Sequence, residues 1–133
     1  MIMGDMISFF VPAPEADKNV NAWQHAVCNE ASQVSPETRA AWVRDEKSAF
    51  EVDATFAFAI PKTKNDSWWY EYNLRPLDSG LVKAIEEALR WVVLRDPVQI
   101  VTVTVRKIYS AIEAGEKPGV KIEVKRLPGR WPR

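Results

Sequence analysis

The chain is poor in the residues that build disulfides, zinc sites and phosphate-binding loops. Its 133 residues include one cysteine, Cys28, one histidine, His25, and five glycines. A single cysteine excludes an intramolecular disulfide and is typical of a reducing compartment, so we expect a cytoplasmic protein. Zinc sites usually draw on several cysteines and histidines, and the five glycines form no phosphate-loop pattern.

Long apolar stretches and a targeting signal are missing as well. No apolar run approaches the roughly 18–20 residues that span a bilayer, so no membrane partner is expected. Residues 1–11 are partly apolar but lack a basic lead and a small-residue cleavage site, which argues against a signal peptide. Apolar residues nevertheless make up 47% of the sequence and six of them are tryptophans, which is enough for one domain with a modest core.

Charge is balanced overall but unevenly distributed. Residues 1–74 hold six Lys/Arg against eleven Asp/Glu, whereas residues 75–133 hold twelve against seven. Residues 125–133 read as a basic C-terminal tail. One interpretation is a surface that follows a nucleic-acid backbone while a tryptophan stacks on a base, and the other is a solvated tail. The candidate nucleic-acid-binding residues are Lys121, Lys125, Arg126, Arg130 and Trp131.

Hydrophobic periodicity predicts a single α+β domain over residues 1–133, with helices packed on a mixed β-sheet in the order β-α-(α)-β-α-β-β. The strand expected at 99–109 is partly apolar on both faces, which predicts a central position in the sheet. The other expected elements are strands at 7–11, 50–60 and 120–124, and helices at 20–32, from 36, and from 78 or 79 to about 93.

Three short motifs lie at fixed spacing between residues 75 and 101. They read Arg75-Pro-Leu-Asp-Ser-Gly-Leu-Val-Lys83, Glu87-Ala-Leu89 and Arg95-Asp-Pro-Val-Gln-Ile-Val101. Together they resemble, without gaps, the core signature of the RusA-type Holliday junction resolvases. The resemblance extends over residues 50–124 and implies a small homodimeric scaffold for branched DNA. It also implies a Mg²⁺-dependent endodeoxyribonuclease, in which carboxylates hold the metal and a lysine holds the phosphate.

The resemblance carries over residue by residue only in part. Lys83 matches the family lysine, Glu87 matches the acid of the Asp-Ala-Leu motif, and Asp96 and Gln99 match the closing motif. The metal-ligand aspartates of the family all fall on residues that offer no carboxylate, namely Leu77, Ser79 and Pro97.

Two hypotheses about the metal site follow. In one, neighbouring carboxylates rebuild it, which makes Lys83, Asp78 and Asp96 catalytic candidates and Asp78, Asp96 and Glu87 metal ligands, with Glu71 as a further acid. In the other, the metal site is gone and the fold serves binding or assembly. Each acid also has a local interpretation, because Asp78 suits a helix N-cap and Asp96 before Pro97 suits a turn.

An aromatic stretch precedes the motifs. Residues 68–72 read Trp-Trp-Tyr-Glu-Tyr. The stretch fits either an aromatic surface that binds bases or a partner protein, or rings that cap the core.

Overall fold

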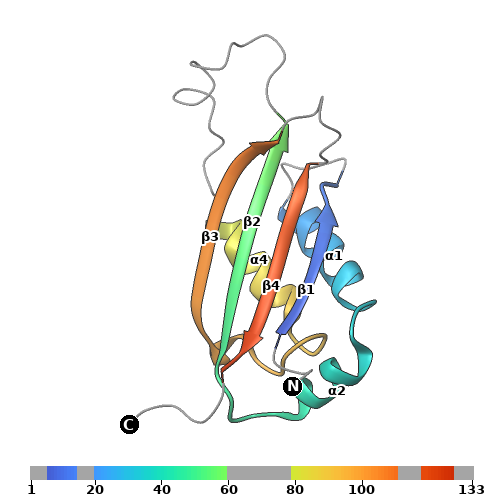
Figure 1. Cartoon of the computed structure of the whole chain (residues 1–133), viewed down its shortest axis with the longest axis vertical. Helices are drawn as coiled ribbons and strands as arrows, with labels where there is room; N and C mark the ends of the chain where they lie inside the picture. Colours follow the sequence, from blue (N-terminus) through green and yellow to red (C-terminus); the bar gives the residue numbers. More distant parts are fainter. Residues whose placement is uncertain (1–5, 15–19, 60–78, 111–117, 128–133) are drawn as a thin grey trace.

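The computed structural model describes residues 6–14, 20–59, 79–110 and 118–127. These residues form one α+β domain, as predicted, with three α-helices packed on a four-stranded mixed sheet (Figure 1). No helix in the described part of the chain is long and apolar enough to cross a membrane. The elements are β1 (Met6–Pro12), α1 (Val20–Ala31), α2 (Pro36–Arg44), β2 (Phe50–Ala59), α4 (Ser79–Leu89), a 3₁₀ helix η1 (Pro97–Gln99), β3 (Ile100–Ser110) and β4 (Gly119–Arg126).

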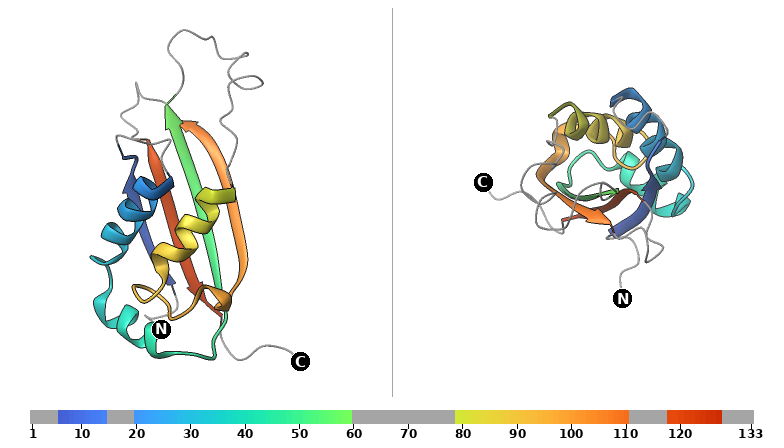
Figure 2. Two further views of the ribbon diagram at one scale, coloured as in Figure 1. Left: turned by 180° about the vertical axis from the view of Figure 1, so that it is seen from behind. Right: turned by 90° about the horizontal axis from the view of Figure 1, so that it is seen from above.

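The strands lie in the order β1-β4-β2-β3. The β1/β4 and β4/β2 pairs are antiparallel, whereas β2 and β3 run parallel. A parallel pair needs a crossover connection, and α4 provides it. The helices α1 and α4 lie side by side on one face of the sheet, and the views in Figures 1 and 2 show no helix over the opposite face among the described residues. We call this opposite face the open face.

Strict alternation along the strands separates the core from the open face. The alternate residues that are buried beneath the helices are Ile7, Phe9 and Val11 in β1, Phe50, Val52, Ala54 and Phe56 in β2, and Val120, Ile122 and Val124 in β4. Two aromatic pairs join the layers: the rings of Trp23 and Phe56 are 5.4 Å apart, edge to face, and those of Trp42 and Phe50 are 5.2 Å apart. Such pairs add about 0.5–1.5 kcal/mol each beyond the burial of their area.

The prediction that the strand at 99–109 is central is wrong. This segment, β3, lies at the edge of the described sheet, and the central strands are β4 and β2. In β3 the valines at 103 and 105 are half-buried, while Thr102 and Thr104 are exposed. Threonine has a high β-propensity in either environment, so its outward position does not separate an edge strand from a central one.

The last predicted helix ends earlier than its apolar stripe suggested. The stripe continues through Val92 and Val93, but α4 ends at Leu89. Beyond that point the amides of Val92, Val93 and Leu94 all donate to the carbonyl oxygen of Leu89, at 3.1, 2.9 and 3.2 Å. Val93 and Leu94 are therefore buried by a tight turn and not by a further helical turn.

Candidate functional site

Asp96 starts a tight turn that is closed at both ends by side chains. It is the N-cap of η1, and its Oδ1 accepts a hydrogen bond from the amide of Val98 at 3.0 Å. Gln99 reaches back, and its Oε1 accepts from the amide of Asp96 at 3.1 Å. This reciprocal arrangement is a capping box, which satisfies backbone amides that the first turn of a helix leaves free. The local interpretation of Asp96 as a turn residue is confirmed.

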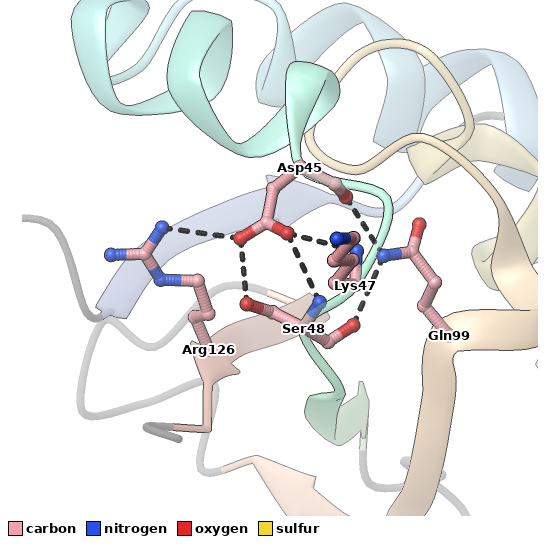
Figure 3. Close-up of polar contacts among 5 residues, drawn as sticks. All are labelled: Asp45, Lys47, Ser48, Gln99 and Arg126. Atoms are coloured by element: carbon pink, nitrogen blue, oxygen red, sulfur yellow. Dashed lines mark hydrogen bonds and ion pairs between the residues drawn. The ribbon is translucent and has the colours of Figure 1, made fainter. Parts of the chain in front are cut away.

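Gln99 also joins this turn to a distant loop (Figure 3). Its Nε2 donates to the carbonyl oxygens of Asp45 at 2.9 Å and Ser48 at 3.0 Å. These residues lie in the connection between α2 and β2. The side chain of Gln99 therefore fixes the start of β3 against the start of β2.

The carboxylate of Asp45 organises the same connection. It accepts hydrogen bonds from the amides of Lys47 and Ser48, both at 3.0 Å, and from Oγ of Ser48 at 2.6 Å. Arg126 lies 3.5 Å from its Oδ2. Burial opposes ionisation of the carboxyl, but these hydrogen bonds and the charge of Arg126 outweigh it and lower the pKa of Asp45 below its ordinary value.

Glu87 and Arg90 form an ion pair on the exposed side of α4. Nε of Arg90 is 3.2 Å from Oε1 of Glu87. The hydrogen bond to Glu87 is the main cause of a raised pKa of Arg90, and the nearby charge of Asp96 raises it further. Two of the predicted metal-binding acids therefore act on the same guanidinium. Lys83 is exposed one helical turn before Glu87, and Asp78 lies outside the described residues.

The carboxylates of Asp96 and Glu87 are both engaged by neighbouring groups of the described chain. Mg²⁺ requires near-octahedral oxygen ligands, but one oxygen of Asp96 accepts an amide hydrogen bond and the carboxylate of Glu87 is paired with an arginine. Within the described ranges, no three acidic, histidine or cysteine side chains lie close enough to share a metal ion.

The predicted nucleic-acid-binding residues separate onto two faces. Lys121 and Lys125 are exposed on the open face of β4. Arg126 points to the other side, where it pairs with Asp45 and its guanidinium lies 6.0 Å from the ring of Trp42. Arg126 therefore stabilises the fold, and it belongs to β4 and not to a tail. Arg130 and Trp131 lie outside the described residues, as do Glu71 and the aromatic stretch 68–72.

Lys121 belongs to a row of four residues that crosses the whole open face. Phe10 pairs with Lys121, Lys121 with Thr55, and Thr55 with Arg106. We call these four residues the cation row. It contains two cations, a hydroxyl and an exposed aromatic ring, and no carboxylate. With neighbouring strands about 4.8 Å apart, the row spans about 14 Å.

The side chains of the row are held in place. The ring of Phe10 lies over Gly119, where a β-carbon would collide with the ring and with the carbonyl oxygen of Val11. Nη1 of Arg106 donates to Oγ1 of Thr55 at 3.2 Å. Gly119 therefore leaves room for the ring of Phe10, and Thr55 orients the guanidinium of Arg106.

Carboxylates lie next to the cation row, at the strand positions closer to Met6 at the start of β1. Arg106 pairs with Asp53 at 3.3 Å and Lys121 pairs with Glu123 at 3.5 Å. Together with Glu51, these acids line a hollow of about 120 Å³. All these pairs are solvent-exposed, and such pairs contribute only about 0–1 kcal/mol each, so a stronger anion can displace them.

Phe10, Thr55 and Arg106 were not predicted as site residues. The only local signal was their outward position in alternating strands. Their alignment with Lys121 depends on the strand order, which no local pattern encodes. A comparison with models of known protein families and a comparison with curated proteins both found no match for the chain.

Proposed function

We propose that this protein binds branched DNA or another structured nucleic acid on a RusA-like scaffold, without cleaving it. The observation that carries the proposal is the cation row, which brings an aromatic ring and two cations together across four strands.

The row has the composition of a surface that binds a nucleic-acid strand. Lysine and arginine neutralise phosphates and release counterions, which gives affinity and a strong salt dependence. An exposed aromatic ring stacks on an unpaired base, which contributes about 1–3 kcal/mol. Phe10 is 41% exposed, so its ring is accessible at one end of the row. A strand laid along the row would contact Arg106 and Lys121 through phosphates and Phe10 through a base.

The side chains available at the motif support binding more than cleavage. Asp96 is used as a helix cap and Glu87 is paired with Arg90. The family positions at Leu77 and Pro97 carry no ligand atom in their side chains. The part of the signature that is retained, Asp96 with Gln99, has a structural task in fixing the α2–β2 connection.

The test is a binding and cleavage assay with a synthetic four-way DNA junction and a linear duplex of the same sequence. We expect tighter binding to the junction, and an affinity that falls linearly with salt on a log–log plot. The double variant Arg106→Ala with Lys121→Ala should reduce the slope by about 2, because about one unit is lost per phosphate contact. Phe10→Ala should weaken binding by roughly tenfold with little change in slope.

Lys47→Ala is the matched control, since it removes an exposed cation away from the open face and should leave binding unchanged. Unaltered binding by the double variant would place the interface elsewhere. Mg²⁺-dependent nicking of the junction that Asp96→Asn abolishes would overturn the non-cleaving part of the proposal.

A further inference from the structure

A second surface lies on the helical side of the molecule, away from the cation row. It is a groove of about 320 Å³ between α2 and the turn that follows α4. We call it the Trp91 groove. Its lining residues are Pro36, Arg39, Ala40, Val43, Arg44, Trp91 and Val92.

Trp91 adopts a backbone conformation that disfavours its own side chain. Its φ is 63°, in the left-handed region where a β-carbon is crowded. The residue closes the turn through its amide, which donates to the carbonyl oxygen of Leu94 at 2.7 Å. Glycine or asparagine is the usual residue at such a position after a helix. The tryptophan gains little core packing in return, because it is 58% exposed. An exposed ring held in a strained backbone is typical of a functional position.

The ring of Trp91 is held in position by its neighbours. The guanidinium of Arg95 lies 5.2 Å from the ring centroid, and Arg95 itself pairs with Glu46 at 3.3 Å. Val93 and Leu94, the next residues in the turn, are fully buried and anchor it to the core. A ring that is already ordered loses little conformational entropy on binding, which favours affinity.

Arg39 fixes the opposite wall. Its guanidinium donates to the carbonyl oxygens of Val34, Ser32 and Val92, and so ties the α1–α2 connection to the turn. Arg39 is therefore fully engaged in structure. Arg44 is exposed in the last turn of α2 and forms no ion pair with another described residue. The groove thus presents one available cation, and no acidic residue lines it.

We propose that the Trp91 groove docks a short segment of a partner protein that carries an apolar side chain next to a carboxylate. The apolar side chain would pack between Trp91 and the wall formed by Pro36, Ala40 and Val43, and the carboxylate would pair with Arg44. Tryptophan and arginine are the residues that most often dominate protein interfaces. A nucleic-acid backbone fits less well, because Glu37 follows the lining residue Pro36 and Glu46 neutralises Arg95.

The test uses synthetic heptapeptides with a central Leu, Phe or Pro, flanked either by Asp or by Lys, with a central Ser as the apolar control. Binding to the full chain is measured by titration calorimetry and by the indole N–H signals in an NMR spectrum. The chain has six tryptophans. The signal that disappears in Trp91→Gly identifies Trp91, and this signal should shift when an Asp-flanked apolar peptide is added.

Trp91→Gly should lower the affinity for that peptide by at least about tenfold. The turn should be kept, because glycine readily adopts the φ of 63° found at this position. Arg44→Ala should weaken binding several-fold, and Arg44→Glu should shift the preference to Lys-flanked peptides. Phe10→Ala, which removes another exposed ring, and Lys47→Ala should bind like the unaltered chain.

Three outcomes would overturn the proposal. The first is equal binding of the Asp-flanked and Lys-flanked sets, or no binding of either. The second is unchanged peptide affinity in Trp91→Gly. The third is that a single-stranded oligothymidine, and no peptide, shifts the Trp91 signal, which would make the groove a nucleic-acid site. None of these outcomes depends on the cation row, whose own test uses Arg106 and Lys121.

Discussion

Between α4 and β3 the chain makes two turns in succession, and these turns use their side chains in opposite ways. In the turn at Asp96–Gln99 both end side chains bond to backbone groups, within the turn and in the α2–β2 connection. In the turn at Arg90–Arg95, Trp91 occupies the left-handed region and its ring is exposed. The first turn is relaxed and internally satisfied, whereas the second retains strain.

A residue that belongs to a recognisable motif is thus not always free to bind a ligand, and a residue outside any motif can be free to do so. Asp96 belongs to the motif that resembles a nuclease signature, yet its carboxylate is used to cap η1. Trp91 belongs to no motif, yet its ring is accessible beside an arginine-lined groove. Four substitutions distinguish the two turns, and the most destabilising comes first.

Gln99→Ala should be the most damaging change, at about 2–3 kcal/mol of unfolding free energy. It removes the partners of the Asp45 and Ser48 carbonyls and of the Asp96 amide, and each partly buried group left unpaired costs about 1 kcal/mol or more. Urea denaturation measures the loss. Gln33→Ala, whose side chain makes only an exposed bond to Asn29, should stay within about 0.5 kcal/mol of the unaltered chain. Equal effects of the two substitutions would mean that Gln99 does not join the two loops.

Asp45→Asn should destabilise the chain by about 1–2 kcal/mol at neutral pH, because hydrogen bonds to a charged acceptor are the stronger ones. The folded-state pKa of Asp45 is lowered, so the folded state binds its proton less tightly than the unfolded state. The stabilisation is therefore complete above about pH 5 and is lost as the pH falls through the lowered pKa. Denaturation at a series of pH values should show the difference between the two proteins shrinking in acid. A difference that grows in acid would contradict this role.

Asp96→Ala should cost about 1 kcal/mol, the usual effect of losing an N-cap, while Asp96→Asn should cost only a few tenths. Asparagine keeps an oxygen that can accept from the Val98 amide. If Asp96 were a metal ligand, Asp96→Asn would still leave stability nearly unchanged, but it would abolish any Mg²⁺-dependent reaction. Thermal denaturation of both variants, together with the junction-cleavage assay, separates a cap from a ligand.

Trp91→Gly should have the smallest effect on stability, between no change and a gain of about 1 kcal/mol. Glycine relieves the left-handed strain, but it loses the contact with Arg95 and gains freedom in the unfolded chain. Urea denaturation of Trp91→Gly and of the unaltered chain measures the difference. A loss of more than about 1 kcal/mol would show that the ring stabilises the turn, and the contrast between the two turns would then disappear.

The sequence predicted most elements because their signals are local. Alternation from Phe50 onward predicted β2, and Pro36 at the first helical position predicted the start of α2. The end of α4 could not be predicted, since Val92 and Val93 continue the helical stripe while the chain already turns at Trp91. The edge position of β3 could not be predicted because its Val-Thr alternation suits either place in a sheet.

The candidate site was predicted less completely than the fold. The local interpretation of Asp96 followed from its place before Pro97, and Lys121 and Lys125 are exposed on the open face. The contacts of Gln99 with a loop 51 and 54 residues earlier had no sequence signal. The homodimer, the magnesium dependence and the branched-DNA partner remain predictions from the resemblance.

Which side of each element is buried can be read from the sequence, because burial follows a period of two along a strand and of 3.6 along a helix. Which outward-facing residues lie next to one another depends on how the elements pack. The strand order aligned Phe10, Lys121, Thr55 and Arg106 in one row, and the packing of α2 against the turn after α4 formed the groove beside Trp91. Such contacts join residues far apart in the chain, so they depend on how the elements pack and not on the local pattern of any one of them.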